Sequence, residues 1–133
     1  MMVLVTAWCL AGCGSESEWD MVSSRDIPSP DGRWIATVFE MCSYNTTGDW
    51  PQVSLRRPGQ KLGKNGNVLA GGPGDGIRAA WTSASNLVVT YCTDSTWPSY
   101  PPERTNRFGV GVEFKRISVT DFRVAAESGW ERR

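Results

Sequence analysis

The sequence predicts an all-β fold, a small antiparallel sandwich or barrel of six or seven strands. Its apolar segments are short, and several of them alternate between apolar and polar residues with the two-residue period of a strand. They are rich in β-branched and aromatic residues, and clusters of glycine, proline, asparagine and serine separate them. Short strands joined by frequent turn signals are typical of sandwiches and barrels.

The first clear strand follows a turn at residues 28–32, where two prolines precede Asp31 and Gly32. Residues 34–42 are then aromatic and β-branched, as in a strand. Alternation divides this strand into one face with Trp34, Ala36, Val38, Glu40 and Cys42 and another with Ile35, Thr37, Phe39 and Met41. We expect the second face to lie in the core.

Five more strands are expected, at residues 52–56, 68–70, 77–81, 87–92 and 107–117. Val53 and Leu55 point inward in the first of these, and the last has Val110, Val112 and Phe114 on one side. The strands at 77–81 and 87–92 form a hairpin around residues 83–86.

The remaining segments are expected to be loops, apart from one near the C-terminus. Residues 43–49 are polar, residues 58–67 are rich in turn formers, residues 71–76 are rich in glycine and residues 95–106 are rich in proline. The glycine-rich segment lacks the Gly-Lys-Ser/Thr ending of a phosphate-binding loop. Residues 121–131 are expected to form a short helix, with a strand through Phe122 and Val124 as the alternative.

The N-terminal residues carry a different signal. Residues 2–10 are apolar, which is far short of the ~20 residues that cross a bilayer but suits the core of an export signal. The run closes in Leu10-Ala11-Gly12-Cys13, which resembles the lipobox of bacterial lipoproteins. No lysine or arginine precedes the run, a departure from export signals that a true start upstream of Met1 would explain.

The lipobox resemblance implies a location and a domain plan. Residues 1–12 would be a signal peptide, residues 13–26 a flexible tether and residues 27–133 a single β domain. Cys13 would carry a diacylglyceryl group that holds the protein on a membrane of the bacterial cell envelope, facing the periplasm or the cell exterior. The alternative is a short apolar N-terminus that contains a cysteine by accident.

Two cysteines remain in the expected domain, Cys42 and Cys92. Because disulfides persist outside the cytoplasm, we expect a disulfide between them, with two buried thiols as the alternative. The bridge would close a loop of roughly 50 residues, which contributes about 4 kcal/mol in the chain-entropy model.

Composition limits the partners. The formal net charge is zero, but residues 13–49 carry seven acids against two arginines, so that the excess positive charge lies in residues 50–133. No dense basic patch of the nucleic-acid-binding type occurs, so nucleic acid is not an expected partner. A metal site needs more ligands than two isolated cysteines, and the chain has no histidine, so neither a metal nor a cofactor is expected.

Two segments resemble known families. Residues 29–36 (SPDGRWIA) resemble the start of a TolB-type propeller repeat, and Ala80-Trp81-Thr82 followed by Leu87-Val88-Val89 is a weaker likeness to the same repeat. A propeller needs at least four blades of four strands, which a chain of 133 residues cannot supply. That likeness is therefore limited to a local turn and strand pattern.

A closer resemblance covers residues 29–117 and is to a family of small bacterial lipoproteins with no assigned activity. The matching motifs are the SPDG turn, Phe39-Glu40 before Cys42, Val53-Ser54-Leu55, Gly66-Asn67-Val68, and the hairpin from Trp81 to Tyr91. The resemblance implies a compact β domain and carries over no catalytic residue.

Catalytic candidates are few, because the chain has no histidine to act as a general base. Glu40 and Glu113 are expected on strands, where they could pair across a sheet as the acid and base of a glycosidase. Each also fits a solvated strand position, which we favour, and we do not expect an enzyme.

Binding candidates are better supported. Trp97 and Tyr100 lie in the stiff proline-rich segment, and Trp50 lies at the end of another loop. Aromatic side chains on stiff segments lose little entropy on binding. The alternative is that these rings cap the ends of the core.

The sequence thus predicts a lipid-anchored extracytoplasmic β domain, attached to a membrane through Cys13, that binds or scaffolds an envelope protein, peptide or glycan without catalysis. One alternative is an inhibitor of a wall-degrading hydrolase, similar to lysozyme inhibitors, that inserts the 95–106 loop into its target. Another is a glycoside hydrolase that uses Glu40 and Glu113.

Overall fold

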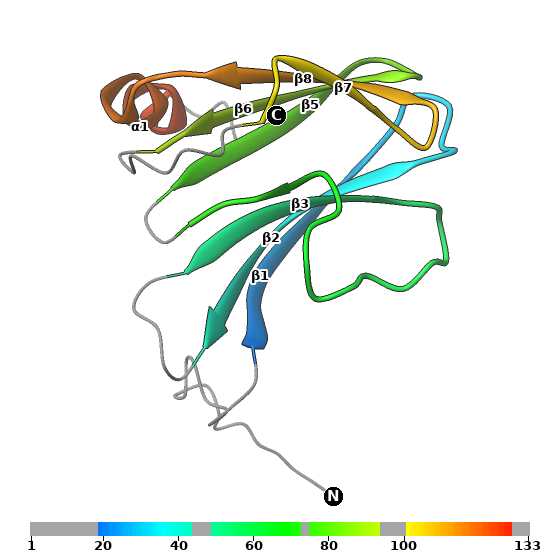
Figure 1. Ribbon diagram of the computed structural model, residues 1–133, viewed down its shortest axis with the longest axis horizontal. Helices are drawn as coiled ribbons and strands as arrows, with labels where there is room; N and C mark the ends of the chain where they lie inside the picture. Colours follow the sequence, from blue (N-terminus) through cyan, green and yellow to red (C-terminus); the bar gives the residue numbers. More distant parts are fainter. Residues whose placement is uncertain (1–18, 44–48, 73–74, 94–100, 129–133) are drawn as a thin grey trace, which may run out of the picture.

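The computed structural model describes residues 19–43, 49–72, 75–93 and 101–128. Two four-stranded sheets face each other (Figure 1). The first has the order β1 (Trp19–Pro28), β2 (Ile35–Ser43), β3 (Trp50–Arg56), β4 (Leu69–Ala70), and the second the order β5 (Gly76–Ser83), β6 (Asn86–Cys92), β8 (Val110–Arg116), β7 (Arg104–Arg107). The predicted all-β class is confirmed, with eight strands in the described residues instead of six or seven.

Strand β1 was not expected. Residues 19–26, assigned to the tether, form most of this strand, which pairs antiparallel with β2 from Trp19 opposite Ser43 to Pro28 opposite Ile35. The register shifts between Met21 and Ser23, which marks a β-bulge. The segment from Met21 to Asp26 lacks apolar alternation, so that its strand conformation depends on pairing with β2 and not on its own pattern.

The strand expected at residues 107–117 is in fact the second half of a hairpin. Its turn lies at Phe108 and Gly109, between β7 and β8. Strand β8 inserts between β6 and β7, and its pairing with β6 is parallel, from Asn86 opposite Gly111 to Tyr91 opposite Arg116. The expectation of a fully antiparallel fold was therefore wrong at this position. A parallel pair needs a long crossover, which the chain between β6 and β8 supplies.

The core lies between the two sheets. The second sheet contributes most of the buried side chains: Ile77, Ala79, Leu87, Val89, Tyr91, Val110, Val112 and Phe114. The first sheet and its β4 connection contribute Ala36, Val53, Leu55 and Val68. The predicted inward directions of Val53 and Leu55, and the shared face of the β8 residues, are confirmed.

The prediction of the core face of β2 was wrong. Ala36 and Val38, from the face that was not chosen, join the core between the sheets. Thr37, Phe39 and Met41 of the chosen face are nevertheless buried, on the outer side of the first sheet. Because β2 is an interior strand covered on both faces, its alternation does not identify which face meets the second sheet.

A polar cluster on this outer side connects three strands. The Thr37 hydroxyl donates to Asp26 Oδ1 (2.8 Å), and Arg56 Nη2 donates to Asp26 Oδ2 (2.9 Å). Arg56 Nε also donates to the fully buried Thr37 Oγ1 (3.3 Å). The Thr37 hydrogen bond lowers the pKa of Asp26, with a further contribution from Arg56, whereas burial acts in the opposite direction. The carboxylate therefore holds β1, β2 and β3 together in its ionised form.

One hydrogen bond joins the edges of the two sheets. Trp81, near the end of β5, donates its indole Nε1–H to the backbone oxygen of Ile27 in β1 (2.8 Å). Both side chains pack against the core. The bond therefore sets how the edge of the second sheet lies against the edge of the first.

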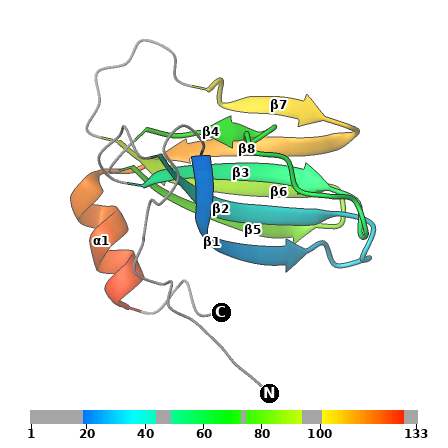
Figure 2. The same ribbon diagram turned by 90° about the horizontal axis from the view of Figure 1, so that it is seen from below.

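The expected C-terminal helix is confirmed as α1 (Val119–Glu127). Ser118 caps its start, because its hydroxyl oxygen accepts the backbone N–H of Asp121 (2.9 Å). The helix lies across one end of the sheets (Figure 2), where a Cβ on Gly76 would collide with the Phe122 ring. Within the described part of the chain, no helix has the length and apolar character that spanning a membrane requires.

The two cysteines of the expected crosslink are both buried, Cys42 at the end of β2 and Cys92 at the end of β6. They belong to different sheets. The expected disulfide between them stays a prediction.

The bond between the sheet edges makes a stability prediction. Trp81→Phe removes the indole N–H and leaves the Ile27 oxygen without this donor, so we expect the free energy of unfolding to fall by about 1–2 kcal/mol. Urea denaturation followed by circular dichroism measures this change. Val124→Ala, at an exposed helix position, serves as the control and should change stability little. Equal stability of Trp81→Phe and the wild type would contradict the role of the bond.

The Asp26 cluster makes a pH prediction. The carboxylate has a lower pKa in the folded protein than in the unfolded chain, so its contribution is present above about pH 4 and is lost as the pH falls through the folded-state pKa. Asp26→Asn should lower the free energy of unfolding at pH 7 by up to about 1 kcal/mol, a modest value because the side chain is half exposed.

Denaturation of the wild type and Asp26→Asn across pH 2–7 tests this expectation. The difference between the two proteins should shrink toward the acid end. Asp49→Asn at another exposed position is the control for the loss of one surface charge. A difference that stays constant with pH would show that the carboxylate charge is not involved.

Candidate functional site

A tightly hydrogen-bonded turn precedes β2. The backbone N–H of Ser29 donates to the oxygen of Trp34 (2.8 Å), and the N–H of Trp34 donates to Ser29 Oγ (3.1 Å). Within the turn, the N–H of Gly32 donates to the Ser29 oxygen (2.9 Å), and Gly32 has a φ of 72°, which favours glycine. Ser29 is buried. The SPDG pattern therefore fixes the backbone position of Trp34.

Asp31 completes this turn. Its Oδ1 accepts the backbone N–H of Arg33 (3.1 Å) and the hydroxyl of Ser29 (2.8 Å). These two hydrogen bonds, the first being the larger effect, lower the pKa of Asp31. Its Oδ2 lies 3.7 Å from Arg33 Nε, and both side chains are exposed, so that ion pair contributes little to stability. The carboxylate is therefore ionised and already engaged within its own turn.

The β7–β8 turn contains an unusual residue. Phe108 has a φ of 55° and Gly109 a φ of 85°, the pair of positive values that a type I′ turn requires. The Asn106 side chain accepts the N–H of Gly109 (3.0 Å) and supports the turn. Asparagine, aspartate and glycine suit the first of these positions, whereas a phenylalanine in left-handed backbone costs about 1–2 kcal/mol. The residue is nevertheless 60% exposed.

These two turns meet through their aromatic side chains. The Trp34 and Phe108 rings stack with their centroids 5.9 Å apart and their planes 20° from parallel. Arg57, which follows the last residue of β3, places its Cζ atom 4.6 Å from the centroid of the Trp34 ring. Trp34 comes from the first sheet and Phe108 from the second, so this stack forms only when the two sheets are correctly packed.

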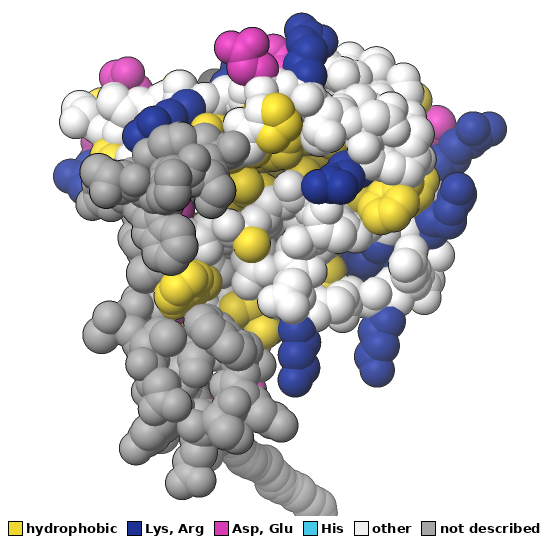
Figure 3. Space-filling model, viewed as in Figure 1, with side chains coloured by type: hydrophobic (Ala, Val, Ile, Leu, Met, Phe, Trp, Pro, Cys, Tyr) yellow, Lys and Arg dark blue, Asp and Glu magenta, His cyan; other side chains and the backbone are white. Residues whose placement is uncertain are grey.

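The stack borders a cavity of about 360 Å³ that we call the end pocket, lined by Asp31, Arg33, Trp34, Arg57, Ala84, Ser85, Phe108, Gly109 and Val110. It lies where the turns after β1, β5 and β7 come side by side, at the right-hand end of the sandwich in Figures 1 and 2. Helix α1 lies at the opposite end. Figure 3 shows Lys and Arg side chains projecting from this right-hand side, with apolar side chains exposed among them.

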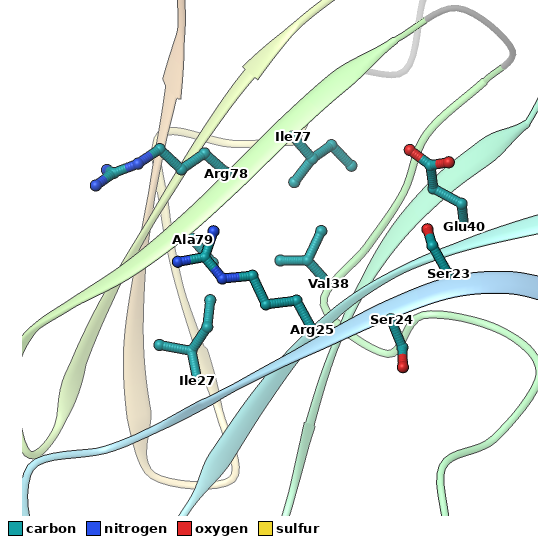
Figure 4. A pocket seen from close by; sticks show the side chains of 9 residues that line it. All are labelled: Ser23, Ser24, Arg25, Ile27, Val38, Glu40, Ile77, Arg78 and Ala79. Carbon is teal, nitrogen blue, oxygen red and sulfur yellow. The ribbon is translucent and has the colours of Figure 1, made fainter. Parts of the chain in front are cut away.

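A second, smaller cavity of about 220 Å³ opens between β1, β2 and β5 (Figure 4). Arg25 and Glu40 point into the space between the sheets, whereas Arg78 points away from it. Glu40 lies on the inward face of β2, and β1 presents Ser23 opposite it. This cavity thus contains one of the two glutamates considered above.

The other glutamate lies elsewhere. Glu113 is in β8 of the second sheet, and its neighbours Val112 and Phe114 point into the core, so that Glu113 faces outward. It borders a third cavity, of about 580 Å³, together with Glu103, Arg104, Lys115 and Arg116. The structure therefore does not bring Glu40 and Glu113 together, and the proposed acid and base couple has no geometric basis.

Of the three predicted binding aromatics, Trp50 belongs to the described residues, and it does not line the end pocket. Trp97 and Tyr100 lie outside the described residues, and with them the first half of the loop proposed for hydrolase inhibition. Trp50 is half buried at the start of β3, whereas Arg57 follows the other end of that strand. In the part of the chain that the structure describes, no group of three or more Cys, Asp or Glu side chains could hold a metal ion.

Sequence reasoning missed Trp34, Arg57 and Phe108 as a group. One signal was present: Asn106-Arg107-Phe108-Gly109 holds a glycine and an asparagine within a strand pattern, which marks a tight turn.

Comparison with protein-family models, with curated proteins and with solved structures found no match. The function of the end pocket is therefore argued from its geometry.

Phe108 makes a prediction about stability. In Phe108→Asn the turn gains a residue that tolerates positive φ but loses the stacking with Trp34, and the two effects are of similar size, about 1 kcal/mol each. We therefore expect a free energy of unfolding equal to the wild type or up to about 1 kcal/mol higher.

Phe108→Ala is the matched comparison, because it loses the ring and keeps the unfavourable backbone, and it should be less stable than Phe108→Asn by about 1 kcal/mol. Thermal and urea unfolding of the three proteins provide the measurement. A clear loss of stability in Phe108→Asn would show that the ring is needed for the fold itself.

Proposed function

We propose that this protein is a non-catalytic binding domain, held on a membrane outside the cytoplasm by lipid on Cys13, and that the end pocket is its binding site. The observation that carries the proposal is the exposed Phe108 ring, kept at an unfavourable backbone position against Trp34. Backbone strain at an exposed aromatic residue is typical of sites under selection for binding.

The anchor follows from the sequence. Leu10-Ala11-Gly12-Cys13 has the lipobox pattern after an apolar run. A diacylglyceryl group attaches a protein stably, because each buried methylene contributes about 0.8 kcal/mol and two chains suffice where one does not.

The path of the chain supports the placement of the pocket. Strand β1 begins six residues after Cys13, and its ten residues carry the chain about 30 Å, at ~3.3 Å per residue, to the turn that holds Trp34. On this proposal the chain enters the domain from its anchor at the start of β1, whereas the end pocket lies near the finish of that strand. On this proposal the pocket faces away from the bilayer, toward the other components of the envelope.

The absence of catalysis is part of the proposal. The two carboxylates considered for glycoside hydrolysis lie on different sheets, one facing inward and one outward. A retaining or inverting glycosidase needs its two carboxyl groups on either side of a single bond, within about 10 Å. A binding role needs only the exposed rings and charges that the end pocket presents.

Metabolic labelling with a palmitate analogue tests the anchor. We expect the wild type expressed in a bacterium to incorporate label and to partition into the detergent phase of a phase-separating detergent, and Cys13→Ala to do neither, because two acyl chains dominate membrane affinity. Cys9→Ala is the matched control, since it removes a cysteine of the leader and should leave both readouts unchanged. Label in Cys13→Ala, or none in the wild type, would contradict the proposal.

A further inference from the structure

We propose that the end pocket binds an anionic glycan, a sugar polymer that carries carboxylate or phosphate groups. This inference rests on the proposed binding function and names its ligand. It is argued from the ring of Phe108, from the charges beside it, and from the kind of backbone that forms the pocket.

The ring supplies an apolar, flat contact. Phe108 is 60% exposed and is fixed by its stacking on Trp34, so that binding costs it little conformational freedom. The face of an aromatic ring is electronegative and attracts weakly positive C–H groups. A sugar ring presents such C–H groups together on one face, and its hydroxyl groups point to the sides.

The charges beside the ring favour an anion. Arg33 and Arg57 line the pocket, and Arg107, exposed, directly precedes Phe108. The one acid in the lining is Asp31, and its carboxylate already accepts hydrogen bonds within the turn. Guanidinium groups bind carboxylate and phosphate in a planar, two-point manner. The single carboxylate of the pocket therefore does not neutralise its arginines, and positive charge remains available to bind an anionic ligand.

The backbone of the pocket disfavours a peptide as the ligand. Extended peptides commonly bind by adding a strand to an exposed sheet edge, where the main-chain groups hydrogen-bond. The end pocket is built from turns, and the N–H groups of Gly32, Trp34, Gly109 and Gly111 already donate within the protein. Recognition here depends on side chains. Side chains suit a ligand whose hydroxyl and acidic groups are carried by a sugar ring.

The size of the pocket agrees with this ligand. Its volume of about 360 Å³ lies at the lower end of the range for small-molecule sites, ~300–1,000 Å³. Residues at the tips of three turns form it, so that a polymer can pass across it and place one or two sugars against Phe108.

The test uses the full chain in detergent micelles and titrates it with five named probes. Polygalacturonate carries carboxylates and phosphomannan carries phosphates; mannan is the neutral match of phosphomannan. Polyglutamate and an oligothymidylate represent acidic peptides and single-stranded nucleic acid. We expect at least one of the anionic glycans to bind, with an affinity that falls as salt is added, and to bind more tightly than the other three probes.

Three variants identify the site. Phe108→Asn and Arg57→Gln should each weaken binding of the anionic glycan about tenfold, which corresponds to about 1.4 kcal/mol. Arg123→Gln removes an exposed cation from α1, at the other end of the sandwich, and should leave binding unchanged. Because Phe108→Asn is expected to fold at least as well as the wild type, a loss of binding there reports on the site and not on stability.

Other outcomes overturn the inference. The inference is wrong if neither anionic glycan binds, or if mannan binds as tightly as phosphomannan while polygalacturonate does not bind. It is also wrong if polyglutamate or the oligothymidylate binds more tightly than the anionic glycans. Finally, it is wrong if Arg123→Gln weakens binding as much as Phe108→Asn and Arg57→Gln do. If polyglutamate or the oligothymidylate binds more tightly than both anionic glycans and its binding depends on Phe108, the binding domain stands and the ligand is wrong. Palmitate labelling decides the anchor independently of all five probes.

Discussion

The hydrogen bond from the Trp81 indole to the Ile27 oxygen is the contact on which the arrangement of this protein most depends. It joins the edge strands of two sheets whose shared core is apolar, and apolar packing has little directional preference. Ile27 lies two residues before the SPDG turn, and Trp81 lies just before the β5–β6 turn. Fixing these two positions aligns the turns of both sheets at one end, and the end pocket exists because Trp34 from one sheet then meets Phe108 from the other.

Local pattern identified the fold class, the interior strands of both sheets and the C-terminal helix, because apolar periodicity, turn formers and caps act over a few residues. Prediction from local pattern failed where the structure of a segment depends on a strand far away in the sequence. Strand β1 has no apolar alternation and is held by β2, and the parallel pairing of β6 with β8 depends on a crossover that no local signal specifies. Phe39 shows the same limit, because a strand covered on both faces looks apolar on both.

The site was harder to predict than the fold, for a physical reason. Trp34, Arg57 and Phe108 are far apart in the sequence and come together only after the sheets have packed. The glutamate pair that was considered as an alternative shows a related limit: the side of the sheet on which each carboxylate lies depends on register, and one residue of register reverses it. A positive φ at a phenylalanine has no sequence signature apart from the glycine and asparagine beside it.

The bulge in β1 has a consequence for the exposed edge of the first sheet. This strand forms an edge of the first sheet, and most of its residues are exposed. A flat exposed edge would let the sheet of one molecule extend into the sheet of the next. The register shift at Met21 and Ser23 twists that edge, and the charged residues along it disfavour a second strand. The irregularity that interrupts the ladder thus protects against edge-to-edge aggregation.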